Sequence, residues 1–208
     1  MIVAVNSGTA APVRVGAEVW LKDLLSMTGA RGGLLLLLIA VLAAIAAYVA
    51  DRDRHIPVRG RYFAGILLES AAYAVAVAIL VSQLVGAIFA AAPPPEGDLW
   101  TQLALSVGAG LYEELFFRVL LVGGLALLVR PLFETANAGY LLAALVGAVL
   151  FSLAHYVGPL GDPFALPSFT FRFAFGLALN VLFLGRGFGV AAWTHALYDV
   201  MVVTGLFG

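Results

Sequence analysis

Long apolar segments constrain the fold of this chain more than any other feature of its sequence. About 20 consecutive, mostly apolar residues allow a helix to cross the hydrocarbon core of a bilayer. Six segments of the 208-residue chain meet or approach this length, and short polar or Gly/Pro-rich breaks separate them. We therefore expect an all-α, polytopic transmembrane helical bundle. The expected spans are residues 33–50, 63–92, 101–129, 138–157, 168–185 and 189–207.

The composition supports this interpretation because the chain carries too little charge for a water-soluble protein. Hydrophobic residues make up 63% of the sequence and charged residues 11%, whereas a soluble domain has roughly 45–50% apolar and about 25% charged residues. We expect a multi-pass integral membrane protein whose surroundings are the lipid bilayer. The usage of Ala, Gly, Val and Arg is typical of a GC-rich bacterium or archaeon and predicts a prokaryotic cell membrane.

Net charge and cysteine content exclude several classes of function. The formal net charge is −1, so no excess of positive charge is available to attract the polyanionic backbone of nucleic acid. The sequence has no cysteine, which excludes disulfides, thiolate catalysis and cysteine-ligated metal centres. Any chemistry must therefore come from oxygen and imidazole groups.

The ionisable residues divide the chain at about residue 100. Before this point the expected spans contain one ionisable residue, Glu69, which can reach toward the Arg-rich loop after the first span. After it they contain several. We expect an N-terminal leader or interfacial helix in 1–32, two accessory transmembrane helices in 33–99 and the functional core in 100–208.

The third expected span carries three charged residues. A charge near the bilayer centre costs about 2.5–3.5 kcal/mol, so such residues point to function. Glu114 and Arg118 are four residues apart, share a helix face and are expected to form an ion pair. Glu113 is five residues from Arg118, about 140° around an α-helix, so we expect it to point elsewhere and to be the reactive carboxylate. A charge clamp between helices is the alternative for this group.

Two histidines lie in other expected spans. His195 and Asp199 in the sixth span are four residues apart, so the carboxylate can hold the imidazole or both can address one substrate group. His155 lies near the end of the fourth span, and Phe151, one turn earlier, can pack beside its ring. A histidine at the end of an apolar helix also fits a hydrogen-bonded residue at the membrane interface.

This set of side chains favours hydrolysis of an amide bond. Glu and His can together deprotonate a water for attack on a carbonyl, while a second His stabilises the oxyanion. The same residues allow a zinc-dependent metalloprotease with His155, His195 and a carboxylate as ligands, although the H-E-x-x-H motif is absent. A non-catalytic membrane scaffold or immunity factor is a third hypothesis. A proton-coupled transporter is disfavoured because the sequence shows no inverted repeat.

The motifs themselves carry a resemblance. Glu113-Glu114-x-x-x-Arg118, Phe151-x-x-x-His155 and His195-x-x-x-Asp199 follow one another on separate apolar segments. In this order they resemble the CPBP family of intramembrane proteases, which contains the CAAX-processing endopeptidases and the bacteriocin-processing or Abi proteins. The resemblance covers roughly residues 100 to 208, which it identifies as a CPBP-like catalytic core.

The resemblance implies a function and a role for each motif. It implies a glutamic-type intramembrane peptidase, similar to the CAAX prenyl proteases, that cuts a peptide bond of a membrane-associated protein or peptide without a cofactor. Glu113 and His155 would activate the water. Glu114 and Arg118 would support the geometry of the site.

The last motif departs from the family pattern. The resemblance implies that His195 and the residue at position 199 form the oxyanion site, where many family members have Asn and this chain has Asp199. A carboxylate accepts hydrogen bonds and repels an oxyanion. Asp199 must therefore carry a proton in the low-dielectric site, or it must orient His195 and leave donation to that ring.

The six expected spans place the two histidines at different depths in the membrane, which conflicts with a shared site. A simple six-span arrangement puts His155 and His195 near opposite faces of the membrane, about 20 Å or more apart. One span is therefore expected to be re-entrant or broken, and the proline-containing residues 159–167 before the fifth span are the expected place. Arg172 and Asn180, inside that span, receive no role.

Overall fold

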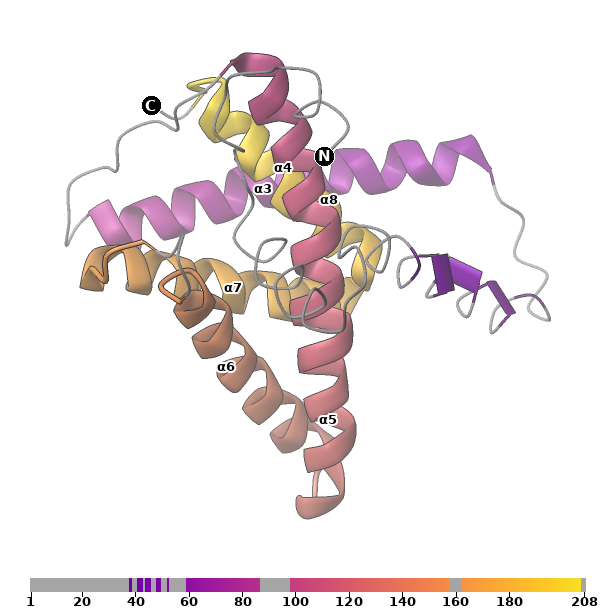
Figure 1. Cartoon of the computed structure of the whole chain (residues 1–208). Coiled ribbons are helices and arrows are strands. Elements are labelled where there is room, and N and C mark those ends of the chain that lie inside the picture. The colour runs from indigo at the N-terminus through magenta and orange to yellow at the C-terminus, as the bar shows by residue number, and fades with distance from the viewer. Residues whose placement is uncertain are drawn as a thin grey trace.

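In the computed structural model, all regular secondary structure of the described part of the chain is helical (Figure 1). Its elements follow each other in the order α3 (Gly60–Gly86), α4 (Leu99–Glu114), the π-helix η2 (Leu115–Gly123), α5 (Gly124–Val129), the 3₁₀-helix η3 (Arg130–Leu132), α6 (Ala136–Ala154), α7 (Leu166–Arg186) and α8 (Phe188–Val203). The described residues are 59–86, 98–157, 162–206 and isolated positions between 38 and 52.

Four helical segments are long and apolar enough to cross a membrane. They are Gly60–Val81, Gln102–Leu132, Ala136–Ala154 and Leu166–Arg186. The all-α membrane fold is thereby confirmed, but the number of six spans is not. The expected leader, 1–32, lies outside the described residues, and so does the first expected span apart from the isolated positions.

The sixth expected span is the one that the structure shortens. Helix α8 has 16 residues, which gives a length of about 24 Å at 1.5 Å per residue, less than the ~30 Å of a hydrocarbon core. It begins at Phe188, directly after Gly187, whose φ of 92° makes the sharp turn from α7. His195 therefore lies in the middle of this short helix instead of near the end of a full span.

The fifth span itself is not broken, while residues 158–161 of the region in which we expected a break lie outside the described residues. Helix α7 is continuous α-helix from Leu166 to Arg186, and Pro167 lies in its first turn. A proline there removes only an N–H that has no partner within the helix, and its fixed φ suits the helical backbone. The irregular backbone lies in the third span instead, where η2 interrupts the α-helical hydrogen bonding directly after Glu114. Such π-helical stretches occur frequently at functional sites.

Small residues allow the helices to approach closely. A Cβ atom on Gly110 of α4 would lie 2.5 Å from the carbonyl oxygen of Ala192 and 2.7 Å from the Cβ of Ala196, both in α8. A Cβ on Gly176 of α7 would lie 2.7 Å from the ring of Phe151 in α6. Small residues at these contacts are typical of membrane helices, which associate by close packing.

Polar side chains join the helices at several points inside the bundle. Asn180 of α7 donates from Nδ2 to the carbonyl oxygen of Ala144 in α6 at 2.7 Å, and Ser152 donates to that of Phe169 at 2.8 Å. Ser70 likewise links α3 to α8. Asn180 thus forms an interhelical contact between α6 and α7.

Helix α8 lies along α4, while α3 and α7 run across the rod formed by α4, η2 and α5 (Figure 1).

Candidate active site

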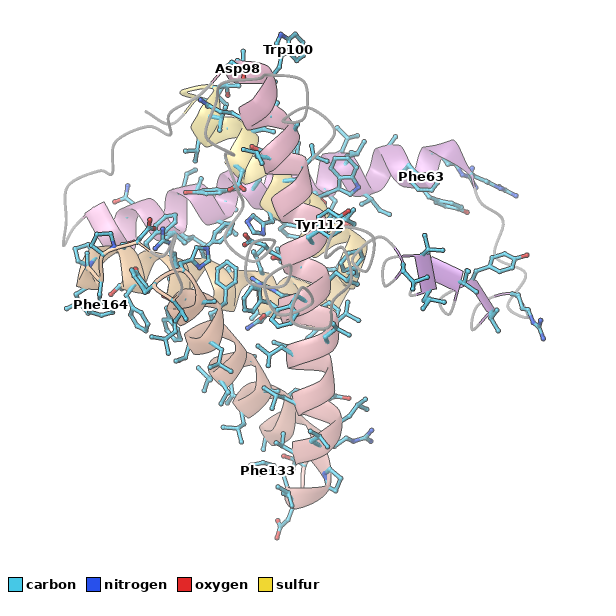
Figure 2. All side chains as sticks on the ribbon, viewed as in Figure 1. Phe63, Asp98, Trp100, Tyr112, Phe133 and Phe164 are labelled. Carbon is cyan, nitrogen blue, oxygen red and sulfur yellow. The ribbon has the colours of Figure 1, made fainter. Side chains whose placement is uncertain are left out.

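The paired glutamates lie deep in the longest helical rod. Figure 2 shows Tyr112 about midway between Trp100, at the start of α4, and Phe133, at the far turn. Glu113 and Glu114 follow Tyr112 directly and are 3% and 0% exposed. Two carboxylates in the middle of an apolar rod are costly to bury unless other groups compensate them.

Arg118 is the cation that compensates Glu114. Its Nε lies 2.9 Å from Oε2 of Glu114, and both side chains are fully buried. The contact is an ion pair by distance, although neither atom has the alignment of a directed hydrogen bond. The guanidinium carbon lies 4.4 Å from the ring centroid of Phe151, within cation–π range. Neither Nη atom has a hydrogen-bond partner among the described residues.

The imidazole of His195 has a carboxylate near each ring nitrogen, but only one of them forms a hydrogen bond. Its Nδ1 lies 2.8 Å from Oε1 of Glu114, and since a carboxylate accepts, we assign the proton to Nδ1. Its Nε2 lies 3.5 Å from Oδ2 of Asp199, one turn further along α8. This separation is too long for a strong hydrogen bond. The Nε2 atom therefore stays available to a third group.

His155 is the residue that caps the C-terminal end of α6. Its Nδ1 lies 2.8 Å from the carbonyl oxygen of Phe151. A carbonyl oxygen only accepts, so Nδ1 carries the proton and Nε2 of the neutral ring holds the lone pair. This tautomer is the one in which Nε2 can act as a base.

The ring of Phe151 joins the two imidazoles. Its centroid lies 5.0 Å from that of His155 and 6.2 Å from that of His195, edge to face in both cases. The ring centroid of Phe175 in α7 lies 5.2 Å from that of His195. The two histidines, which a simple span arrangement separates by depth, thus converge on one aromatic side chain.

Glu113 belongs to the same neighbourhood. It is buried and directly precedes Glu114 in the chain. A π-helix winds less per residue than an α-helix, because its hydrogen bonds run from i to i+5. The start of η2 at residue 115 therefore reduces the angular separation between Glu113 and Arg118 that a regular α-helix predicts.

Two contributors to this region were not predicted from the sequence. Phe175 lies in the expected fifth span, but nothing in its sequence context distinguishes it from the other phenylalanines there. Arg172 stands out as a charge inside that span, and the structure pairs it with Asp162. Its guanidinium carbon also lies 5.2 Å from the ring centroid of Tyr156.

No group of three His, Asp or Glu side chains within the described residues has an arrangement that could hold a metal ion. Both Nδ1 atoms of the two histidines already have partners, a carbonyl oxygen for His155 and a carboxylate for His195. Only the Nε2 atoms remain to face a reacting group.

Comparison with known proteins identifies the family. A family model described as type II CAAX prenyl endopeptidase, Rce1-like, matches residues 94–201. The match covers just over half of the 208 residues and spans all three motifs. The chain belongs to this family. No curated protein and no solved structure matches the chain.

Family membership confirms the resemblance that the motifs carry. The Rce1-like family implies a CAAX protease-like intramembrane endopeptidase. Together with the four apolar helices, it makes this chain an integral membrane protein of a hydrolase family that acts on membrane-associated peptide substrates.

Proposed function

We propose that this protein hydrolyses a peptide bond by means of a water that Glu113 and His155 activate, without a covalent intermediate. The observation that carries the proposal is the contact of Phe151 with both imidazoles. Through this ring His155 neighbours His195, which is bonded to Glu114, the residue after Glu113. A carboxylate and an imidazole base at one place can bind a water and remove its proton.

Nε2 of His155 is the base in this mechanism. Because Nδ1 donates to the carbonyl oxygen of Phe151, the lone pair of Nε2 is the one that accepts the water proton. The hydroxide attacks the substrate carbonyl, and the imidazolium then returns the proton to the leaving amine. Glu113 binds the second hydrogen of the water and stabilises the imidazolium.

In the proposed mechanism His195 and Asp199 stabilise the oxyanion. With Nδ1–H directed to Glu114, Nε2 of His195 and the carboxylate of Asp199 are two acceptors 3.5 Å apart. A proton carried by either of these two atoms makes the pair a donor toward the developing oxyanion. Glu114 and Arg118 then act as support, since Glu114 fixes the ring of His195 and Arg118 neutralises Glu114.

The proposal extends to the organisation of the chain. Residues 100–208 form the catalytic core, and residues 33–99 supply accessory transmembrane helices. The expected location is a prokaryotic cell membrane. The expected partners are a peptide or protein substrate and the lipid bilayer.

The replacement of Glu113 by Gln tests the catalytic assignment. We expect purified wild-type protein in liposomes to cleave a prenylated CAAX peptide that carries a quenched fluorophore. Glu113→Gln removes the carboxylate at nearly constant volume and is expected to lower the rate about 10²–10⁴-fold. Its thermal stability should stay close to that of the wild type.

Glu69→Gln is the matched control, because it removes a glutamate of α3 that pairs with Arg186 away from the candidate site. It should retain the wild-type rate. Full activity of Glu113→Gln would contradict the catalytic assignment.

Treatment of the wild type with a chelator tests the metalloprotease alternative. The proposed mechanism predicts no loss of rate. A loss of rate that added zinc reverses would favour the zinc-dependent mechanism instead.

A further inference from the structure

Arg172 is a charged residue of the apolar helix α7 that belongs to none of the three motifs. Its guanidinium pairs with Asp162, which precedes α7. The Nη1 atom is buried and has no hydrogen-bond partner among the described residues. The side chain is 22% exposed. Placing such a group in an apolar helix is costly, so its position calls for an explanation.

The ion pair is connected to His155 through the backbone of Asp162. The backbone N–H of Asp162 donates to the carbonyl oxygen of His155 at 2.9 Å. The guanidinium carbon of Arg172 lies 5.2 Å from the ring centroid of Tyr156, the residue after His155. Arg172 therefore holds the chain at His155 in two ways, through the backbone contact of Asp162 and through the neighbouring ring.

His155 needs this support because of its place in the helix. As the C-cap of α6 it lies where the last carbonyl groups lack partners within the helix. Its own carbonyl finds one in Asp162. Residues at helix ends open most easily, whereas a catalytic base must be held within about 0.5 Å of its working position.

Other contacts already hold α6 against α7. The hydrogen bonds from Ser152 to Phe169 and from Asn180 to Ala144 join the two helices independently of Arg172. The packing of Phe151 against Gly176 adds to them. Loss of the ion pair should therefore act locally, at the turn that carries His155, and leave the helix pair assembled.

We propose that Arg172 is a positioning residue, which acts through its ion pair with Asp162 to keep the ring of His155 in the Nδ1–H tautomer. Loss of the pair releases the turn, and the ring leaves the carbonyl oxygen of Phe151. The imidazole then populates both tautomers. For its activity readout alone, this inference rests on the proposed function.

The tautomer of His155 can be measured without any substrate. The chain has 3 histidines, so ¹⁵N-histidine labelling of the full-length protein in detergent micelles gives few ring-nitrogen signals. A His155→Gln variant identifies those of His155. The wild type should show His155 with a protonated Nδ1 and a bare Nε2. Arg172→Gln should shift the His155 nitrogens toward the average of two tautomers and leave those of His195 unchanged.

A double variant that exchanges the two charged partners is the decisive test. Exchanging the two partners in the double variant Asp162→Arg, Arg172→Asp should restore the single tautomer that each single change disturbs. Arg186→Gln, which removes the last arginine of the same helix and its contact with Glu69, should leave the signals of His155 unchanged. Unaltered His155 signals in Arg172→Gln, or no restoration in the double variant, would overturn the inference.

Kinetics separate this inference from the proposed function. Arg172→Gln should lower kcat about 10- to 100-fold, as expected for a displaced catalytic group, with KM unchanged, and Arg172→Lys should recover part of the loss. If the wild type cleaves peptides and Arg172→Gln keeps both its kcat and its tautomer, the inference fails alone. If the tautomer responds but the protein cleaves no peptide, the proposed function fails alone.

Discussion

Two glutamate–arginine pairs of this protein have similar chemistry and opposite surroundings. Arg186 at the end of α7 binds Glu69 of α3 through two nitrogens, at 2.6 and 2.8 Å, and the side chains are 54% and 26% exposed. Arg118 places Nε 2.9 Å from Oε2 of Glu114 without the alignment of a directed hydrogen bond, and both side chains are fully buried. The pair with the better mutual geometry is thus the one that water can reach.

The difference indicates what each pair does. The exposed pair satisfies its own charges and joins two helices. The buried pair leaves atoms for other partners, since Oε1 of Glu114 accepts from His195 and the guanidinium lies over Phe151. A buried ion pair gains little net stability from its charges, because desolvation offsets their attraction. Its presence in the membrane is therefore better explained by the imidazole that it orients.

Breaking the buried pair should have the largest effect. Arg118→Gln leaves Glu114 as a buried carboxylate without its cation, and removal of one partner of a buried pair costs about 3–5 kcal/mol. We expect a loss of that size in the free energy of unfolding, measured by denaturant titration in mixed micelles, together with loss of peptide cleavage. Arg118→Lys keeps the positive charge and should recover part of the stability. Wild-type stability of Arg118→Gln would show that Glu114 does not depend on this cation.

The sequence predicts those parts of the fold that depend on a single helix. Apolar length alone indicates the helices that become α3, α6 and α7. The length of α8 was not predictable in this way, because residues 189–207 are apolar almost throughout and end at Val203 only in the structure. Pro159, Pro163 and Pro167 suggested a break, but Pro167 lies in the first turn of α7, where a proline is compatible with continuous α-helix.

The same limit applies to the candidate site. Helical periodicity predicts the pairs that are four residues apart, and the structure has Glu114 beside Arg118 and His195 beside Asp199. The bond between Glu114 and His195 joins residues 81 positions apart. No local pattern encodes it, because it depends on how closely α4 and α8 approach at Gly110. The π-helix after Glu114 leaves no mark in the sequence that separates it from α-helix.

Replacing Asp199 by Asn should have a smaller effect on rate and a distinct effect on its pH dependence. In the wild type, either His195 Nε2 or the Asp199 carboxyl must carry a proton to serve as the donor, so cleavage should decline as rising pH removes that proton. The amide of Asp199→Asn donates at any pH, and the decline should weaken. At neutral pH the rate should stay within about tenfold of the wild type, whereas loss of an oxyanion donor costs about 10²–10³-fold.

The profile of kcat/KM against pH, recorded for both proteins in the same liposomes, measures this difference. Asn and Asp have nearly the same volume, so packing around His195 is preserved in the comparison. An inactive Asp199→Asn protein would mean that the carboxylate itself is required, either to orient His195 or to hold a ligand. In that case the departure from the family pattern at this position would be part of the chemistry of this chain.

Breaking the exposed pair should have the smallest effect of all. Glu69→Gln leaves Arg186 where water can solvate it, and exposed ion pairs contribute little to stability. We expect an unfolding free energy within the error of the wild-type measurement and an unchanged cleavage rate, in the same titration and assay as Arg118→Gln. Comparing Glu69→Gln with Arg118→Gln tests whether burial distinguishes the two ion pairs. If Glu69→Gln destabilises the protein as much as Arg118→Gln, burial does not distinguish the pairs, and the orientation of His195 would no longer be needed to explain the buried one.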